Sequence, residues 1–550
     1  MILSRILSRR LSRKTELRAL AGVARVAAAL CLLPMIAVAV AAAGGGTDTL
    51  AMLWGTVLPG YTATTAALVV LVALGTLVLG TTTAGLVVLT DFPGRRVVEV
   101  LLVLPLAFPA YVLAYAYTHL LDHPGIVQSS LRAITGWGPR DYWFPEVRSL
   151  GGAALMLTLV LYPYVYLLTR AALLGQSASA YFAARTLGRT PIQAFFTVVL
   201  PLARPAVAAG VLLATMETIA DFGTVSYFGV QTFATGIYQA WFAMFDRIAA
   251  AQLSLGLLVF ALLLALLERY NRRRAQFHSG RRHETLPRVR LTGWGRGLAQ
   301  IICGVPVTLG FVIPVVALGL MATQSDQSLL DPRYLGFLRN SVLLASVAAC
   351  VTVLAALALG AVNRARGTRG AAAMLAVGRL GYAVPGGVIA VGLLVPFATF
   401  DNAVDDLMRR LFDWPTGLLL TGSIWVLIMA YVIRFLAAAI GAYEGGQSVI
   451  NPNLDMASRV LGASSYGTLR RIHLPLLRPS LLTALLIVFV DVMKELPATL
   501  IMRPFNFDTL AVQAYRLAAD ERLDGAAVPS LVIAAVGLVP VVLLVRRMRG

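Results

Sequence analysis

Acidic side chains within apolar segments are the residues of this chain whose types and spacing could do chemistry. Glu217 and Asp221 lie in one apolar run, and Asp491 and Glu495 lie in another together with Lys494. A charge inside a hydrophobic segment is costly, so such residues are candidates for function by default. Carboxylate oxygens suit hard cations, although four carboxylates do not name one. The same groups could instead only hold helices together, and the sequence leaves both interpretations open.

The spacing of these acids predicts where they lie in the membrane. Glu217 is 12 residues after Pro205, or about 18 Å along a helix, just past the middle of a hydrocarbon core of roughly 30 Å. Asp221 follows one turn later, so we expect it to share a helix face with Glu217, where like charges repel. In the other run, Lys494 follows Asp491 by three residues and could offset part of the negative charge.

The elements that must position these residues are membrane helices. The 550 residues are 58% hydrophobic and 13% charged, with a mean hydropathy of +0.79. Soluble domains carry roughly 25% charged residues, so the composition excludes an ordinary soluble protein. Long apolar runs also exclude a disordered or nucleic-acid-binding chain, despite a formal net charge of +20. The single cysteines Cys31, Cys303 and Cys350 lie in apolar runs and are expected to be buried.

Twelve segments are long and apolar enough to cross a membrane as helices of about 20 residues. Six lie in the first half of the chain and six in the second, which predicts an all-α polytopic membrane protein. The first segment could be a cleaved signal peptide, but its long basic lead-in favours an uncleaved anchor. The segments lie near 22–43, 61–90, 97–121, 150–174, 202–225, 247–267, 298–322, 337–362, 371–400, 416–440, 475–500 and 527–545.

Basic residues are distributed unevenly between the predicted loops. With the N-terminus inside, the cytoplasmic segments carry 31 basic residues and the opposite loops carry 9. By the positive-inside rule, both termini are predicted to be cytoplasmic, and the net charge reports membrane topology. The arginine-rich residues 268–297 are predicted to form a cytoplasmic linker. Residues 401–415 are predicted to form a short interfacial helix on the opposite side.

The chain contains an internal repeat. Residues 181–240 align without a gap on residues 455–514, at a constant offset of 274. Because six predicted spans separate the two copies, both have the same orientation. This is a parallel repeat, in which a pathway is expected between the halves. We therefore predict a first six-helix repeat at 1–267 and a second at 298–550.

A predicted cytoplasmic loop precedes the fifth span of each repeat. The first loop (residues 181–201) and the second loop (residues 455–475) carry small residues, a glycine and a Leu-Pro pair at the same spacing. Small residues let a helix lie close to a partner surface, glycine permits a tight turn, and proline breaks or starts a helix. The residues concerned are Phe182, Ala183, Ala184, Arg185, Gly188, Leu200 and Pro201 in the first loop, and Met456, Ala457, Ser458, Arg459, Gly462, Leu474 and Pro475 in the second.

Both loops resemble the permease loop of binding-protein-dependent ABC importers, in which Glu-Ala-Ala precedes a Gly and then Ile-x-Leu-Pro. The resemblance implies a short coupling helix in each loop that docks on a separate ATP-hydrolysing subunit, and hence two such subunits. The glutamate of the family is replaced by Phe182 and Met456, although Asp455 precedes the latter. Docking is therefore expected to rest on apolar contact and on nearby arginines. These arginines are Arg185, Arg189 and Arg459.

Two longer strings resemble bacterial ferric-iron importer permeases, at residues 216–229 and at 494–500 with 503–510. The similarity covers essentially the whole chain. It implies a type I importer permease with two fused repeats in the bacterial cytoplasmic membrane, moving iron(III) inward at the expense of ATP. The implied partners are the ATPase, membrane lipids and a periplasmic or lipid-anchored ferric-binding protein.

In such importers the binding protein supplies most of the selectivity, so tight iron binding and a resident cofactor are not expected here. Translocation-pathway candidates are Glu217, Asp221, Asp491, Lys494 and Glu495.

Other functions are excluded or kept as alternatives. The chain has no GxxxxGK[ST] phosphate loop and no GxSxG motif, so it is predicted to be neither the ATPase nor another enzyme. A permease of the same class for thiamine, a polyamine or another small solute remains an alternative. An ion-gradient-driven secondary transporter would leave the two loops without a purpose. A membrane scaffold would bury carboxylates without function, at a cost of several kcal/mol.

Overall fold

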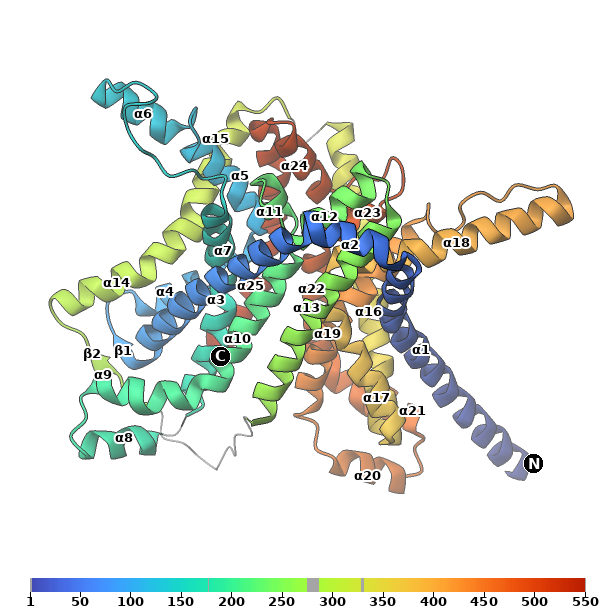
Figure 1. The fold of residues 1–550 in the computed structure, drawn as a ribbon. Coiled ribbons are helices and arrows are strands. Elements are labelled where there is room, and N and C mark those ends of the chain that lie inside the picture. The colour runs from blue at the N-terminus through green and yellow to red at the C-terminus, as the bar shows by residue number, and fades with distance from the viewer. Residues whose placement is uncertain (1, 177, 275–285, 328–330, 550) are drawn as a thin grey trace. The chain divides into compact units, whose positions relative to one another are not determined.

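The computed structural model describes residues 2–176, 178–274, 286–327 and 331–549. Helices form almost all of its regular structure (Figure 1). Among the described residues, eleven helices are long and apolar enough to cross a membrane, or up to twelve if one bent pair counts as a single span. The prediction of an all-α polytopic protein is confirmed.

The chain divides into two compact units, each made of three separate stretches. Unit 1 comprises Met1–Met52, Ile237–Leu258 and Pro332–Val512. Unit 2 comprises Leu53–Gly236, Val259–Asp331 and Gln513–Gly550. Both units therefore contain segments from both predicted repeats, and the repeat boundaries remain a prediction from the sequence.

Each unit has its own set of helices, and unit 2 also has two short strands. Unit 2 contains α3 (Leu58–Leu89), β1 (Thr90–Asp91), α4 (Arg95–Leu101), η1 (Leu104–Ala107), α5 (Ala110–Leu121), α6 (Ile126–Thr135), α7 (Leu150–Leu174), α8 (Ala178–Thr186), α9 (Pro191–Ala194), η2 (Phe195–Val199), α10 (Leu200–Ala220), α11 (Gly223–Tyr227), β2 (Val289–Arg290), α14 (Trp294–Val307), η4 (Thr308–Val312), α15 (Ile313–Gln324) and α25 (Leu523–Arg549). Unit 1 contains α1 (Ile2–Gly44), η3 (Gln239–Ala243), α16 (Pro332–Arg366), α17 (Arg369–Gly378), η5 (Leu380–Ala383), α18 (Gly386–Phe412), α19 (Ile424–Gln447), α20 (Asn453–Val460), α21 (Ser465–Thr468), η6 (Leu469–His473), α22 (Leu474–Met493) and α23 (Pro497–Met502). The helices α2 (Gly46–Thr56), α12 (Phe233–Tyr238), α13 (Arg247–Arg274) and α24 (Leu510–Ala519) cross the unit boundaries.

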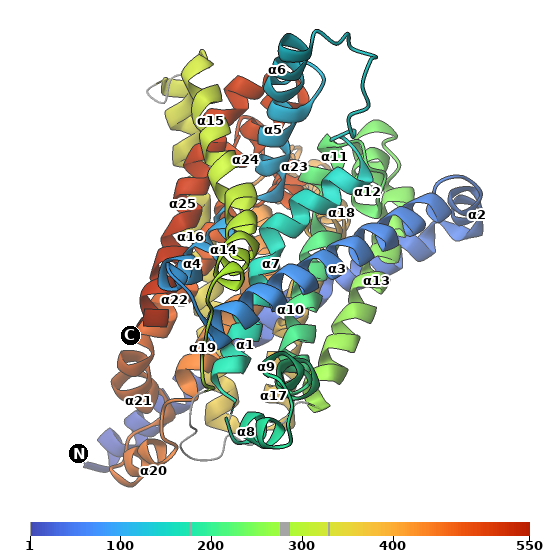
Figure 2. The ribbon, with the colours of Figure 1, turned by 90° about the vertical axis from the view of Figure 1, so that its left-hand side faces the viewer.

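The centre of unit 2 is the packing of α3, α7 and α10, which cross one another in Figures 1 and 2. Glycines make this packing close. A Cβ atom added to Gly80 of α3 would lie 2.5 Å from Cβ of Val165 in α7. A Cβ atom added to Gly210 of α10 would lie 2.7 Å from Cα of the same Val165. Small residues at helix contacts let backbones approach, which is how membrane helices gain packing energy.

Unit 1 is built in the same way from α16, α19 and α22. Gly360 of α16 makes room for the ring of Tyr443 in α19, because an added Cβ would lie 2.0 Å from its Cε1 atom. Gly446, near the end of α19, likewise faces Ser480 of α22. The three helices follow the order of α3, α7 and α10 in the chain, so each repeat supplies one such packed trio.

The first and last helices pack against elements of the other predicted repeat. In unit 1, α1 packs on α16, α17 and α18. A Cβ added to Gly392 of α18 would lie 2.4 Å from the carbonyl oxygen of Pro34. In unit 2, α25 packs on η1, and a Cβ added to Gly537 would lie 2.3 Å from the carbonyl oxygen of Ala107. These close approaches explain why the compact units do not follow the order of the chain.

Several predicted spans end or bend earlier than hydropathy indicates. The span near 97–121 is a pair of helical segments bent by 94° between Ala107 and Ala110. The spans near 202–225 and 475–500 stop at Ala220 and Met493, and each is followed by a separate short helix. Hydropathy misses these breaks because the residues after them are also apolar. The span near 416–440 begins only at Ile424.

The interfacial helix predicted at 401–415 is instead the end of α18, which continues from the membrane span to Phe412. Asp401, fully buried, accepts hydrogen bonds from the backbone N–H groups of Leu420 and Thr421 at 2.8–3.1 Å. These bonds hold the following loop against the helix (Figure 1, orange). Leu407 and Leu411, on this end of α18, are exposed.

Two further expectations meet the structure in part. Cys31 and Cys303 are buried as predicted, but Cys350 is exposed on α16, so the expectation of three buried cysteines is wrong for it. In the predicted linker 268–297, α13 runs on to Arg274, β2 pairs in parallel with β1, and α14 begins at Trp294. Residues 275–285 of that linker lie outside the described residues.

Candidate functional site

The first and second loops have the same backbone structure, at the offset of 274 found in the sequence. Helices α8 and α20 end at Thr186 and Val460, and a turn stabilised by three backbone hydrogen bonds follows each of them. In the first loop the N–H groups of Leu187, Gly188 and Arg189 donate to the carbonyl oxygens of Ala183, Arg185 and Ala184, each at 3.1 Å. In the second loop Leu461, Gly462 and Ala463 donate to Ala457, Arg459 and Ser458, each at 3.0 Å.

Glycine is required at the centre of both turns. Gly188 has φ of +82° and Gly462 has φ of +75°, in the left-handed region that side chains disfavour. An added Cβ would meet nothing within 4 Å at either position, so the constraint is the backbone conformation and not space. Gly188 and Gly462 therefore each occupy a left-handed turn, and their part in coupling stays a prediction.

The second half of each loop starts with a capped turn and leads into a membrane span. The Thr190 hydroxyl accepts a hydrogen bond from the N–H of Gln193 at 3.2 Å, and the Ser464 hydroxyl accepts one from Gly467 at 3.0 Å. A π-helical turn follows in each copy, η2 or η6, and then α10 or α22. Pro201 and Pro475 are the second residues of α10 and α22, and each helix continues without a break from the π-helical turn before it.

The two loop helices expose apolar side chains. Phe182 is 45% exposed and Met456 is 58% exposed, whereas Ala184 and Ser458, two residues later, are buried. The exposed set of both loops also includes Leu187, Ala183 and Arg185 in the first, and Val460, Leu461, Ala457 and Arg459 in the second. In Figure 1, α8 and α20 each lie at the lower end of the helices of their own unit. Exposed apolar groups on a short surface helix indicate a contact surface for a partner.

The two loops are anchored differently. In the second loop, Asp455 accepts hydrogen bonds from Nε of Arg364 at 2.7 Å and from Nε2 of His473 at 2.5 Å. Burial of Asp455 raises its pKa, but the bonds from Arg364 and His473 outweigh it, so the pKa lies below its ordinary value. At the corresponding place in the first loop, Tyr181 is buried in the apolar core of unit 2. One loop is therefore held by charge and the other by apolar packing.

Asp221 and Glu495, two of the five predicted pathway residues, accept backbone hydrogen bonds at the start of a short helix. Asp221 accepts bonds from the N–H groups of Thr224 and Val225 at 3.0 and 3.2 Å, and so caps α11. Glu495, at the same offset of 274, accepts bonds from the N–H groups of Ala498 and Thr499 at 3.0 and 3.1 Å and caps α23. Both carboxylates thus start the short helix that follows a broken span.

The prediction that Glu217 and Asp221 share one helix face is wrong, because α10 ends at Ala220 and Asp221 has an extended backbone. Glu217 is partly exposed within α10. In the other repeat, Lys494 lies 3.0 Å from a carboxylate oxygen of Asp491, so this pair forms the salt bridge that its spacing suggested.

Arg434 adds a positive charge that the sequence reasoning did not select. Its Nη1 atom lies 3.7 Å from Oε1 of Glu495, although the two residues are far apart in the sequence. The sequence reasoning also did not select the side chains that anchor or cap the two loops. The anchoring set is Arg364 and His473 with Asp455, and the caps are Thr190 and Ser464. Only the caps have a sequence signal, a Thr or Ser three residues before the residue that it caps.

Broken spans, repeated loops and the many apolar helices define a multi-pass membrane transport subunit. The chain belongs to the family described as the binding-protein-dependent transport system inner membrane component, which matches residues 76–276 and 352–549. Each match contains one of the two loops and the span that follows it. The predicted class, an importer permease of type I architecture with two repeats, is confirmed.

Two of the relatives are similar over most of the chain and a third over about a quarter of it. The Fe(3+)-transport system permease protein FbpB 2 of Haemophilus influenzae is 27% identical over 491 residues, which are 87% of this chain and 88% of that protein. The probable ABC transporter permease protein y4fN of Sinorhizobium fredii is 27% identical over 468 residues, covering 79% and 78%. The molybdenum transport system permease protein ModB of Escherichia coli K12 is 31% identical over 148 residues, covering 26% and 60%.

Proposed function

We propose that this chain is the permease of an ABC importer that moves iron(III) inward across the bacterial cytoplasmic membrane. The observation that supports iron(III) as the substrate is the similarity to the Fe(3+)-transport permease over 87% of this chain and 88% of the relative. The similarity to the molybdenum permease covers 26% of this chain and supports only the shared permease architecture.

The coupling role is proposed for the first and second loops. A separate cytoplasmic ATPase subunit docks on the exposed faces of α8 and of α20, one copy on each. The exposed Phe182 and Met456 and their apolar neighbours support this role, as does the identical turn geometry. Because Asp455 is engaged with Arg364 and His473, docking rests on apolar contact and on the exposed arginines.

The pathway role is proposed for Glu217 and for the Asp491–Lys494 pair. Their side chains are partly exposed, as is that of Asp221, but Asp221 and Glu495 are engaged in capping short helices. A transient path for a trivalent cation needs negative charge without a closed ligand set. A periplasmic or lipid-anchored ferric-binding protein delivers the iron.

Uptake of radioactive iron(III) tests this function. Cells that lack their own iron permease receive the cognate ATPase and binding protein, with or without this chain. Uptake is expected only with this chain and is expected to stop when the ATPase carries a hydrolysis-blocking substitution. If iron uptake is absent while the ATPase still co-purifies, the chain remains an ABC permease but iron is rejected as its substrate. Molybdate, thiamine and polyamines would then be tested in the same cells.

A further inference from the structure

A pocket lined by four arginines lies in unit 2, and its lining includes no residue of the first loop and neither of the capping carboxylates. Its volume is about 430 Å³, and its wall is formed by the turn after α3 and by the segment around β2. The lining residues are Asp91, Phe92, Gly94, Arg95, Arg96, Arg288 and Arg290. Four positive charges face one negative charge there, so the pocket is strongly cationic.

The backbone holds these arginines in place. Strand β1 pairs in parallel with β2, with Asp91 opposite Arg290, and the N–H of Leu291 donates to the carbonyl oxygen of Asp91 at 3.1 Å. Arg288 directly precedes β2 and Arg290 is its second residue, and both line the pocket. This pairing brings arginines nearly 200 positions apart in the sequence to one site.

Arg95 forms the fixed wall of the pocket. Its side chain is only 9% exposed, and its Nη1 atom donates to the carbonyl oxygen of Val87 at 3.0 Å. It lies 3.5 Å from Glu99 and 3.9 Å from Asp91, which neutralise part of its charge. The like charges of Arg288 and Arg96 also act on it.

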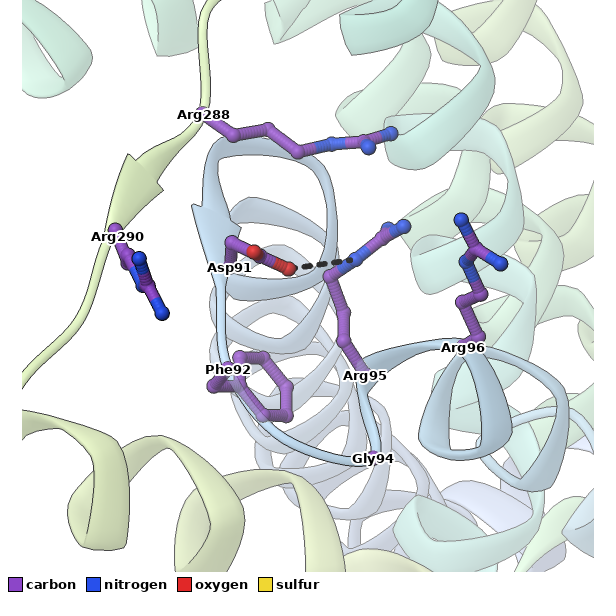
Figure 3. A pocket seen from close by; sticks show the side chains of 7 residues that line it. All are labelled: Asp91, Phe92, Gly94, Arg95, Arg96, Arg288 and Arg290. Atoms are coloured by element: carbon purple, nitrogen blue, oxygen red, sulfur yellow. Dashed lines mark ion pairs between the residues drawn. The ribbon is translucent and has the colours of Figure 1, made fainter.

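The remaining guanidinium groups are available to a ligand. Figure 3 shows those of Arg95, Arg96 and Arg288 on one side of Asp91, with Arg290 on its other side. Arg96, Arg288 and Arg290 are exposed, and within the described part of the chain none of them has an ion pair with a carboxylate. The guanidinium fork matches the oxygens of a phosphate group with two parallel hydrogen bonds.

We propose that this pocket binds a phosphate group at the predicted cytoplasmic surface of the membrane. The group belongs either to the headgroup of an anionic lipid or to a free phosphate compound. A water molecule takes about 30 Å³ of liquid volume, so the pocket has room for a tetrahedral phosphate. The neighbouring loops 91–96 and 268–297 are those predicted to face the cytoplasm, where both sources are present.

The full chain in nanodiscs with matched arginine variants tests this site. The test variant is Arg288→Gln with Arg290→Gln, and the control is Arg366→Gln with Arg369→Gln. Arg366 and Arg369 are exposed, and Arg369 begins α17 as Arg95 begins α4, at the offset of 274. The control therefore removes the same charge, from the loop of the second repeat that corresponds to residues 91–96.

Two arms separate the two sources. In phosphatidylcholine discs, calorimetric titration with inorganic phosphate measures binding of a free anion. In discs that also contain phosphatidylglycerol, native mass spectrometry counts the lipids retained by the protein. Loss of two guanidinium groups should weaken binding by about tenfold or more in the arm that reports the true ligand, with the control unchanged.

Each outcome of the two arms either assigns the ligand or rejects the site. A change in the phosphate arm assigns a free phosphate compound, and a change confined to the lipid arm assigns a lipid headgroup. Equal behaviour of wild type, test and control in both arms would overturn the proposal. If the double variant does not elute as a monodisperse protein, Arg96→Gln from the other side of the pocket replaces it, with the same expected direction and the same contradicting result.

Discussion

At the scale of single residues, the carboxylates of this chain divide by what surrounds them. Asp221 and Glu495 receive backbone hydrogen bonds and start short helices, and Asp455 is enclosed by Arg364 and His473. A carboxylate used in this way stabilises the fold. The pathway role stays a proposal for Glu217 and for the Asp491–Lys494 ion pair.

The first prediction separates these two groups of carboxylates. Glu217→Ala with Asp491→Ala should slow iron uptake several-fold while the protein still assembles and melts within about 1 kcal/mol of wild type. Asp221→Ala should instead cost about 1–2 kcal/mol of unfolding free energy, because it removes a helix cap. Uptake assays and thermal unfolding in detergent measure the two effects. Failure of the double variant to fold would assign Glu217 and Asp491 to helix packing.

The second prediction concerns the anchor of the second loop. The folded state lowers the pKa of Asp455, so its stabilisation is complete above the ordinary Asp pKa of about 3.9 and is lost as the pH falls through the lower folded value. Asp455→Asn should cost about 2 kcal/mol near pH 7, since two charge-assisted hydrogen bonds are weakened. The difference from wild type should shrink on acidification.

Thermal unfolding between pH 3 and 7 checks this prediction, over a range set by the ordinary Asp pKa of about 3.9. Asp406→Asn is the matched control, because Asp406 is exposed on α18. It should follow wild type at every pH. A constant difference between Asp455→Asn and wild type over the whole range would contradict the assigned role of Asp455.

At the scale of elements, the loop turns are the features that repeat most closely. The third prediction is that Gly188→Val with Gly462→Val leaves the protein inserted in the membrane but uncouples ATP hydrolysis from uptake. A β-branched residue at positive φ costs roughly 1–2 kcal/mol per site and would tilt α8 and α20 away from their docking orientation. ATPase activity and iron uptake are measured together in proteoliposomes.

Gly370→Val provides the control for this change. Gly370 lies in α17, and an added Cβ there also meets nothing within 4 Å, but its backbone is helical. The control should transport normally. Normal uptake in the Gly188 and Gly462 double variant would remove the case for these loops as the coupling elements.

The elements also show which features could be predicted. The repeat at an offset of 274 predicted the positions of both loops, of their turn glycines and of the Leu-Pro pairs at the start of α10 and α22. These features could be predicted because each depends on local sequence. The breaks after Ala220 and Met493 were missed, since hydropathy continues through Phe222 and Leu496. The sequence did contain a capping signal. In each copy a carboxylate stands three residues before the first backbone N–H that donates a hydrogen bond to it, and in the second copy Pro497 is the first residue of α23.

At the scale of the whole molecule, contacts distant in sequence could not be predicted. Arg364 and Asp455 are 91 positions apart, and nothing in the local pattern pairs them. The membership of α1 and α25 in their compact units likewise depends on close packing at Gly392 and Gly537. Composition and the repeat were sufficient to predict the class of protein, because membrane helices and duplicated loops can both be recognised from local sequence.

The central claim is that the chain offers two equivalent docking helices to its ATPase, and site-directed cross-linking tests it most directly. Phe182→Cys and Met456→Cys are made singly in a background in which the three native cysteines are replaced by alanine. Each should cross-link to the ATPase subunit in membranes, whereas Leu407→Cys, on the exposed end of α18 predicted to face the opposite side, should not. Cross-linking from neither loop position, with the ATPase still bound to the permease, would contradict the account.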